Sequence, residues 1–293
     1  MCPSAHFARP QYLVETEWLA QHLDDPGVRV LECTVYLHPK PEGGFRAESG
    51  REKWTEGHIP GAGFADLTHD LSDRTSSLNY MMPPAEQFAE VMGRLGVGAG
   101  VRVILYDRAV NMWAARVWWM LRAFGFDAAA VLNGGWKKWT GEGRPVATDA
   151  GTRPPQTFVA NWRPELIADK RAVLAGVGER ATCLLNALTP EQHAGTGGVV
   201  YGRPGRIKGS ANVAARDLVD PKTHAYLPAG TLREKFKASG ALDAGRVITY
   251  CGGGIAASSD AFVLTLLGKD DVALYDASLS EWAADTSLPM ERD

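Results

Sequence analysis

The sequence lacks the features that mark several common classes of protein. Its 293 residues carry a formal net charge of only -3, so no strong positive field favours nucleic acid as a partner. No apolar run approaches the roughly 20 residues that a membrane-spanning helix needs. The N-terminal residues show no basic segment followed by an apolar stretch, so we expect no secretory signal and a cytoplasmic location. These absences favour a globular protein that binds neither nucleic acid nor membrane.

Cysteine is scarce as well. Cys2, Cys33, Cys183 and Cys251 are widely spaced, and no CxxC pair is present. This spacing argues against a zinc site and against a disulfide framework. In a cytoplasmic chain such thiols stay reduced, and most free cysteines behave as small buried hydrophobic residues. A chemical role for any one of them therefore has to come from its local context.

The chain repeats itself with a period close to half its length. In the first half an apolar run ends at Tyr106 and is followed by Asp107. In the second half a matching run ends at Tyr250 and is followed by Cys251. Such a long period indicates a duplicated domain and not a solenoid of short repeats. A stretch rich in Gly and Pro, residues 141–155, separates the two copies as a linker does.

We expect each copy to form one α/β domain, with a mostly parallel sheet flanked by helices, because short apolar runs alternate with helical patterns. The predicted strands are 28–31, 101–106, 128–132, 182–185, 247–250 and 272–275, and the predicted helices are 84–95, 113–124, 231–239 and 258–267. The expected boundaries are an N-terminal domain at 1–145, a linker at 146–160 and a C-terminal domain at 161–293. Ligands of such sheets bind beyond the carboxyl ends of the strands, where Asp107 and Cys251 are placed.

The segment after the second of these strands has the composition of an anion-binding loop. Its residues are Cys251, Gly252, Gly253, Gly254, Ile255 and Ala256. Glycines let successive backbone N–H groups turn toward one centre, and the helix that follows adds the positive potential of its N-terminus. Such surroundings lower the pKa of a thiol from about 8.5 to roughly 3.5–7.5 and produce a nucleophilic thiolate. A glycine-rich turn that only joins a strand to a helix is the alternative, but the first copy, with Asp107, lacks both the cysteine and the glycines.

The chain resembles the tandem rhodanese family, which comprises thiosulfate and 3-mercaptopyruvate sulfurtransferases. The matching segments are Gly57-His58-Ile59-Pro60-Gly61-Ala62, 115–122 and 132–136 in the first half, and 205–213, 251–256 and 275–282 in the second. The resemblance implies two tandem rhodanese-like domains, of which the N-terminal one is inactive. It also implies that Cys251 takes a sulfur atom from thiosulfate or 3-mercaptopyruvate as a persulfide, held by N–H groups of the loop. Cyanide, a small thiol or reduced thioredoxin would accept the sulfur, and neither a metal nor an organic cofactor would be needed.

The residues that would choose the donor differ from the family pattern. The loop carries neither the Arg-Lys pair typical of thiosulfate enzymes nor the Gly-Ser-Gly-Val-Thr pattern typical of mercaptopyruvate enzymes. Leu188 and Ala194 stand where the family often has arginine. We predict that Arg203 and Arg206 bind the donor instead, since a guanidinium fits either a carboxylate or thiosulfate. Ordinary surface arginines are the alternative.

Three other functions fit parts of the pattern. A phosphatase of a related fold needs an arginine six positions after the cysteine, where this chain has Ala257. A non-catalytic rhodanese-like binding module would have no need of Cys251. A sulfur carrier that serves one partner protein is compatible with the uncharged loop.

Overall fold

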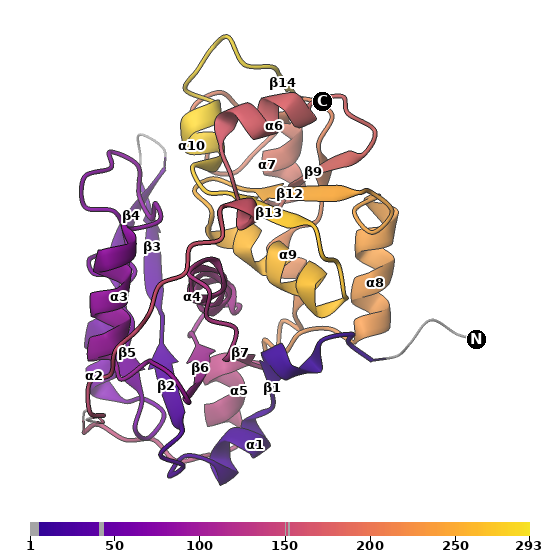
Figure 1. Ribbon diagram of the computed structural model, residues 1–293. Coiled ribbons are helices and arrows are strands. Elements are labelled where there is room, and N and C mark those ends of the chain that lie inside the picture. Colours follow the sequence, from indigo (N-terminus) through magenta and orange to yellow (C-terminus); the bar gives the residue numbers. More distant parts are fainter. Residues whose placement is uncertain (1–5, 41–43, 150, 152) are drawn as a thin grey trace.

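Two five-stranded sheets with the same strand order form the framework of the protein (Figure 1). The computed structural model describes residues 6–40, 44–149, 151 and 153–293. The first sheet has the order β1 (Leu13–Val14), β7 (Ala129–Leu132), β6 (Arg102–Tyr106), β2 (Val28–Glu32) and β5 (Gly63–Phe64). The second has the order β8 (Ile167–Ala168), β13 (Val272–Tyr275), β12 (Arg246–Tyr250), β9 (Thr182–Asn186) and β11 (Ala211–Asn212). All neighbouring strands in both sheets are parallel. The shared order confirms the duplication and the predicted parallel sheets.

The helices repeat in the same way. The first domain contains η1 (Pro10–Tyr12), α1 (Thr16–Gln21), α2 (Arg51–Glu56), α3 (Ala85–Arg94), α4 (Met112–Ala123) and α5 (Gly135–Gly141). The second contains η2 (Pro164–Leu166), α6 (Lys170–Gly176), α7 (Pro190–Ala194), η3 (Ala215–Leu218), α8 (Ala229–Ala238), α9 (Ile255–Leu266) and α10 (Ser278–Trp282). Within the described residues, no helix is both long and apolar enough to span a bilayer. The predicted strands and helices are confirmed, with ends that differ by a few residues.

Helices α4 and α9 pack against each other and join the two domains. Ten of the twelve residues of α4 are buried, because its apolar side chains face its own sheet on one side and α9 on the other. The ring of Trp118 on α4 meets that of Phe262 on α9 edge to face, with the ring centroids 4.9 Å apart. Buried aromatic pairs of this kind contribute both apolar area and a preferred orientation. The interface therefore has the character of a protein core.

A buried ion pair crosses the same interface. Nη1 of Arg116 on α4 lies 2.6 Å from Oδ1 of Asp276, which follows β13, and both side chains are almost fully buried. The second carboxylate oxygen of Asp276 accepts a hydrogen bond of 2.7 Å from the N–H of Met82. Arg116 also donates to the carbonyl of Tyr80. Three segments that are distant in the sequence meet at this point.

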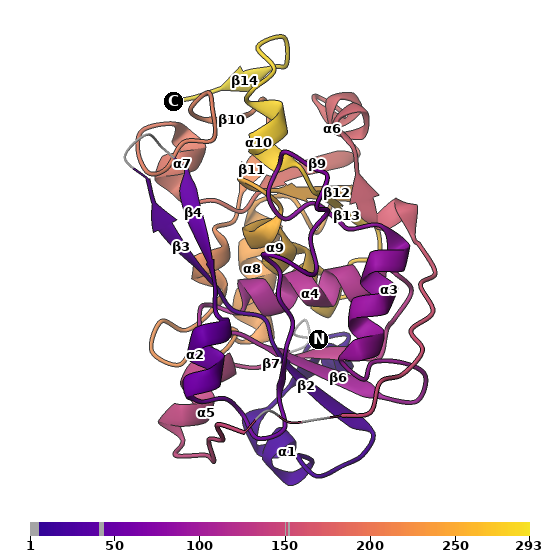
Figure 2. The same ribbon diagram turned by 90° about the vertical axis from the view of Figure 1, so that its left-hand side faces the viewer.

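An antiparallel hairpin, β3 (Val35–Pro39) and β4 (Phe45–Ser49), leaves the first domain and was not expected from the sequence. Figure 2 shows the two strands extending from the first domain alongside the second. The ring of Phe45 lies 6.4 Å, centroid to centroid, from that of Tyr201 in the second domain. The hairpin thus extends the interface beyond α4 and α9.

The segment after α5 carries the chain from one domain to the other. Its backbone is anchored to the first domain, since the N–H of Gln156 donates to the carbonyl of Gly93 and that of Asn161 to Phe124. No helix or strand occurs among its described residues before Pro164. We propose for the folded protein the boundaries expected above, 1–145, 146–160 and 161–293.

Loss of the buried pair should destabilise the protein strongly. Arg116→Ala leaves the Asp276 carboxylate buried without its cation, and breaking a buried pair in this way costs about 3–5 kcal/mol. Lys53→Gln is the matched control, because Lys53 pairs with Glu56 on the exposed surface of α2 and such pairs contribute little. Urea unfolding followed by tryptophan fluorescence measures both variants. A midpoint for Arg116→Ala that equals that of Lys53→Gln would contradict a stabilising role for the pair.

Candidate active site

Residues 251–254 join the end of β12 to the start of α9 at the centre of the second sheet. Strand β12 is paired on both sides, with β9 and β13, so it gives Cys251 a rigid base. Helix α9 begins at Ile255, after Gly254 turns with φ +79° into the left-handed region. A Cβ at Gly254 would also lie 2.9 Å from the carbonyl oxygen of Asp276. Glycine is required there both for the turn and for the close approach of Asp276.

Ser278, at the start of α10 just after β13, holds the loop through hydrogen bonds. Its Oγ accepts hydrogen bonds from the N–H of Cys251, at 3.0 Å, and from the N–H of Gly254, at 3.2 Å. The same hydroxyl donates to the carbonyl of Tyr275 at 2.8 Å. The N–H of Gly254 is therefore used to hold the loop, and the persulfide-binding role predicted for this residue does not fit the geometry.

Gly252 allows the ring of Tyr201 to lie directly on the loop. A Cβ at this position would be only 2.1 Å from Cζ of Tyr201, so no other residue fits without moving the ring. The carbonyl of Gly252 accepts hydrogen bonds from the N–H and the hydroxyl of Ser280, at 2.9 and 2.7 Å. Gly253 is different, since the atom nearest to its added Cβ, Oγ of Ser280, would be 3.9 Å away.

The equivalent loop of the first domain shows how backbone N–H groups converge in this turn. Asp107 occupies the position of Cys251, and its buried carboxylate accepts four backbone hydrogen bonds. The donors are the N–H groups of Ala109 (2.8 Å), Asn111 (3.1 Å), Trp113 (2.9 Å) and Ala114 (3.0 Å). Burial raises the pKa of Asp107 to about 6, and the four donors oppose this shift by favouring the charged form. The anion that the turn of the first domain binds is therefore the carboxylate of its own Asp107 side chain.

The second domain has a related turn between Cys251 and α9 that is one residue shorter. When α9 is aligned with α4, the counterparts of Trp113 and Ala114 are Ala256 and Ala257, whereas the counterpart of Asn111 is Gly254, whose N–H donates to Ser278. The first turn of a helix leaves its N–H groups without partners inside the helix and carries a positive potential. The turn that holds the Asp107 carboxylate in one domain is thus suited to a negatively charged sulfur in the other.

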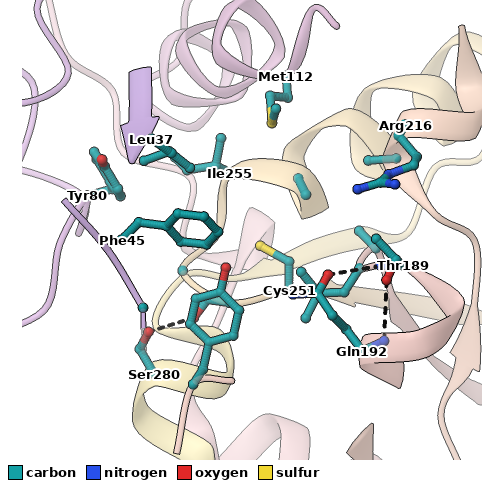
Figure 3. Close-up of a pocket in the computed structure, with 18 of the residues that line it drawn as sticks. Leu37, Phe45, Tyr80, Met112, Thr189, Gln192, Arg216, Cys251, Ile255 and Ser280 are labelled. Atoms are coloured by element: carbon teal, nitrogen blue, oxygen red, sulfur yellow. Dashed lines mark hydrogen bonds between the residues drawn. The ribbon is translucent and has the colours of Figure 1, made fainter. Parts of the chain in front are cut away.

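Cys251 faces a cavity of about 400 Å³ between the two domains (Figure 3). The loop contributes Cys251 and four of its predicted residues, namely Gly252, Gly253, Ile255 and Ala256. The first domain closes the other side with Leu37 and Phe45 of the hairpin, Tyr80 and Met112. Apolar and aromatic side chains thus form much of the wall, and the first domain completes the cavity.

The charged groups of the wall are cationic. Arg216 on η3 and Lys40 on the hairpin line the cavity, whereas no Asp or Glu among the described residues does so. Arg216 is exposed, and its guanidinium makes no hydrogen bond or ion pair within the part of the chain that the structure describes. Figure 3 shows Arg216 beside Thr189, across Cys251 from Phe45. Arg216 could not be predicted from the sequence, because it belongs to no motif and only the position of η3 brings it to the site.

The structure does not bring Arg203 and Arg206 into the cavity of Cys251. The Arg203 side chain donates to four backbone carbonyls, those of Trp282 (3.2 Å), Ala283 (3.1 Å), Asp285 (2.6 Å) and Leu288 (3.0 Å). Arg206 pairs with Glu291, at 3.1 Å, and with Asp293, at 2.8 Å. Both arginines hold the C-terminal segment in place. The donor-binding role predicted for them is corrected accordingly, because their hydrogen-bond donors are engaged elsewhere.

The other cysteines lie in unfavourable surroundings for a thiolate. Burial raises the pKa of the Cys33 thiol well above its usual value, and the charge of Asp107 adds to the shift. Burial also raises the pKa of Cys183 to about 11. Cys2 lies outside the described residues. Cys251, in contrast, has a helix N-terminus and a cavity beside it.

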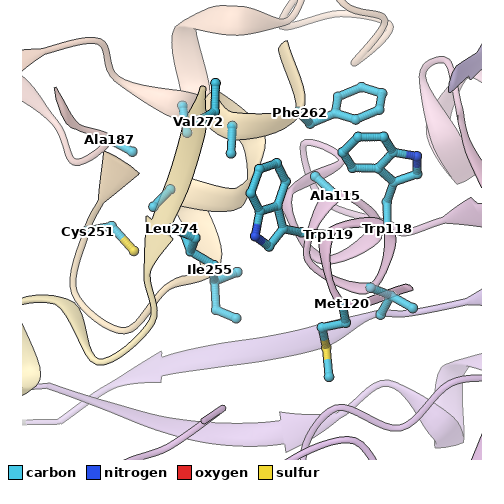
Figure 4. Packing of buried hydrophobic residues seen from close by; sticks show 14 of the residues in the cluster. Ala115, Trp118, Trp119, Met120, Ala187, Cys251, Ile255, Phe262, Val272 and Leu274 are labelled. Carbon is cyan, nitrogen blue, oxygen red and sulfur yellow. The ribbon is translucent and has the colours of Figure 1, made fainter. Parts of the chain in front are cut away.

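A buried apolar cluster shields the loop of Cys251 from solvent on the side that faces the protein core (Figure 4). Cys251 and Ile255 belong to the same buried cluster as Leu274 on β13 and Trp119 on α4. Cys251 itself is only 3% exposed. Because charges and dipoles interact more strongly away from water, this shielding strengthens the effect of the loop N–H groups on the sulfur.

The chain is similar to known proteins over most of its length. Residues 15–142 and 179–285 match the model of the rhodanese-like domain. Human 3-mercaptopyruvate sulfurtransferase is 33% identical over 284 residues, which cover 92% of this chain and 91% of that protein. Thiosulfate sulfurtransferase of Cricetulus griseus is 33% identical over 279 residues, with the same coverage. The 3-mercaptopyruvate sulfurtransferase of Escherichia coli K12 is 32% identical over 299 residues, covering 96% and 98%.

Solved structures agree with this likeness. The crystal structure of SseA from Escherichia coli, described as a 3-mercaptopyruvate sulfotransferase, matches with a TM-score of 0.80 and 30% identity, covering 91% of this chain and 98% of that one. An anaerobic ergothioneine biosynthesis enzyme from Chlorobium limicola matches with a TM-score of 0.83 but 21% identity, covering 99% and 72%. That second likeness concerns the fold alone. The expected α/β fold of two tandem rhodanese-like domains is confirmed.

Substitutions at the two adjacent glycines should have unequal effects. Gly252→Ala forces the Tyr201 ring off the loop, and we expect roughly a 100-fold loss in kcat/KM for sulfur transfer, since small misplacements in a site are costly. Gly253→Ala has room for the methyl group and keeps its N–H, so its loss should be much smaller. Steady-state assays of thiocyanate formation compare the two. Equal losses would contradict the steric role of Tyr201.

The Asp107 carboxylate should make stability depend on pH. Its folded pKa of about 6 lies above the ordinary 3.8, so the folded protein binds this proton more tightly than the unfolded chain does. The stabilisation is complete below about pH 4 and is lost as the pH rises through about 6, a loss of up to about 3 kcal/mol. Urea unfolding of wild type and Asp107→Asn between pH 4 and 7 isolates this contribution. Free energies of unfolding that change in parallel would contradict it.

Proposed function

The chain belongs to the rhodanese family, and we propose that this sulfurtransferase transfers a sulfane sulfur through a persulfide on Cys251. The observation that supports the proposal most directly is the repeat itself. The turn of the first domain holds the Asp107 carboxylate with four backbone N–H groups, and the corresponding turn of the second domain, one residue shorter, presents Cys251. A thiolate, and then a persulfide, would take the place of that carboxylate.

In the proposed first half-reaction the Cys251 thiolate attacks the outer sulfur of the donor. A sulfur–sulfur bond forms, and the bond between that sulfur and the rest of the donor breaks. With thiosulfate the electron pair leaves on sulfite. With 3-mercaptopyruvate it leaves on the carbon of pyruvate, which takes up the proton released by the donor thiol. Both donors stay within the proposal, because the loop contains no side chain that selects one of them.

In the proposed second half-reaction an acceptor removes the outer sulfur. Backbone N–H groups of the loop, around Gly252, Gly253, Ile255 and Ala256, would hold the persulfide charge until then. The acceptor forms a bond to the outer sulfur, and the electron pair of the sulfur–sulfur bond returns to Cys251 as the thiolate. Cyanide and small thiols fit this step best, because Cys251 is 3% exposed and lies in a cavity.

The proposed function extends to reduced thioredoxin as a protein acceptor and to the cytoplasm as the location of the protein. Reduced thioredoxin would have to place its cysteine in the mouth of the cavity to reach the persulfide. A carrier that hands its sulfur to one partner protein would face the same obstacle, since the sulfur is not on the surface. A reducing cytoplasm, in which Cys251 stays a thiol, is the location that we propose.

Mass spectrometry of the intact protein tests the carrier residue. Reduced wild type incubated with thiosulfate or with 3-mercaptopyruvate should gain one sulfur atom, and cyanide should remove it as thiocyanate. Cys251→Ser should neither gain the sulfur nor form thiocyanate. Cys183→Ser is the matched control and should load fully, because the Cys183 thiol has a pKa raised to about 11. Loading that persists in Cys251→Ser would overturn the proposal.

A further inference from the structure

We infer that the cavity of Cys251 is built for an organic sulfur donor whose oxyanion head is bound by Arg216 and whose apolar body, of aromatic size, lies against the hairpin. The inference rests on the proposed function, since the donor has to place its outer sulfur at Cys251. Beyond that function, it assigns the selection of the donor to Arg216 and names the chemical class of the donor.

The size of the cavity is the first argument. Its volume of about 400 Å³ falls within the roughly 300–1,000 Å³ typical of pockets for much larger organic ligands. Thiosulfate and 3-mercaptopyruvate are small polar molecules that would occupy only part of it. A donor that fills the space would displace water from apolar walls and gain the corresponding free energy.

The chemistry of the wall is the second argument. The side away from Arg216 is formed by Leu37, Phe45 and Tyr80, and Tyr201 packs next to Phe45 with the ring centroids 6.4 Å apart. In Figure 3 the labelled side chains Leu37, Phe45 and Tyr80 gather on one side of Cys251. Flat aromatic surfaces of this kind favour an aromatic or similarly apolar group over a charged one.

The position of Arg216 is the third argument. It is a cation of the wall whose guanidinium makes no hydrogen bond or ion pair with the described residues, and the carboxylate that its charge reaches, that of Glu191, does not line the cavity. Arg203 cannot replace it, because its guanidinium is held by backbone carbonyls. A planar guanidinium binds carboxylate or sulfonyl oxygens through paired N–H donors. In a donor whose sulfonyl group carries both the oxygens and the apolar body, oxygens at Arg216 and the body at Phe45 would direct the terminal sulfur toward Cys251, which lies between these two side chains in Figure 3.

An aromatic thiosulfonate is the simplest donor of this class. The Cys251 thiolate would attack its outer sulfur, and a sulfur–sulfur bond would form. The bond between the outer and the sulfonyl sulfur would break, and the electron pair would leave with the aryl sulfinate. No proton moves, and neither an oxidant nor a reductant is needed. Cyanide would then release the sulfur as thiocyanate.

The test compares benzenethiosulfonate with methanethiosulfonate as donors and cyanide as the acceptor. Wild type should show a kcat/KM for the phenyl donor at least about tenfold above that for the methyl donor. Part of any such difference is intrinsic reactivity, so the informative quantity is the change of this ratio in Phe45→Ala. We expect Phe45→Ala to lower the ratio several-fold by weakening the phenyl donor alone. An unchanged ratio would overturn the role of the hairpin wall.

Arg216→Gln tests the anionic head. We expect it to raise KM for both thiosulfonates by roughly ten- to a hundredfold with little change in kcat, and Arg216→Lys to restore part of the affinity. Arg171→Gln is the matched control, because Arg171 lies on α6 with a side chain that is 92% exposed, outside the wall of the cavity. Unchanged KM values in Arg216→Gln would overturn the inference.

Intact-mass measurements separate this inference from the proposed function. If Cys251 gains a sulfur atom from the donors but the variants leave the ratio and the KM values unaltered, only the donor class is wrong. If no donor loads Cys251, including thiosulfate and 3-mercaptopyruvate, the proposed function itself fails.

Discussion

The buried pair of Arg116 and Asp276 couples the contact between the domains to the loop of Cys251. Asp276 follows β13 and directly precedes the segment that supplies Ser278, whose hydroxyl holds two N–H groups of the loop. Nη1 of Arg116 lies so near Gly254 that a Cβ there would be 3.3 Å from it. The domain interface and the turn of Cys251 are therefore in direct contact, and the geometry at Cys251 depends on how the two domains dock.

The two copies of the domain use one turn in two ways. In the first copy, Asp107 supplies its own negative charge, and the four N–H groups around it are permanently satisfied. In the second copy, the negative charge would form during the proposed reaction, first on the Cys251 thiolate and then on its persulfide. The first copy has kept the anion-binding geometry without the nucleophile, and it contributes α4 and the hairpin to the site of its neighbour.

Long regular elements and the glycine turn between β12 and α9 could be predicted from the sequence, because apolar runs such as that of β12 and the glycines after Cys251 are local signals. The hairpin could not, since strand 35–39 changes from buried to exposed along its length without alternation, and the alternation of strand 45–49 extends over only five residues, none of them buried. The arginines show the same limit. The orientation of the Arg203 side chain depends on carbonyls about 80 residues away in the sequence. The location of Arg216 at the cavity depends on the position of a short 3₁₀-helix. Neither the partners of Arg203 nor the position of Arg216 is evident from the local sequence.

The origin of the hairpin in the first domain has a consequence for how such proteins can diversify. The proposed sulfur carrier, Cys251, lies on one half of the chain, whereas Leu37 and Phe45 belong to the other. Substitutions in the hairpin can reshape the cavity without touching the strand, turn and helix that hold Cys251. A domain with Asp107 in place of a cysteine can thereby serve its neighbour as an adjustable recognition surface, and substitutions there would alter substrate preference while the turn that holds Cys251 stays the same.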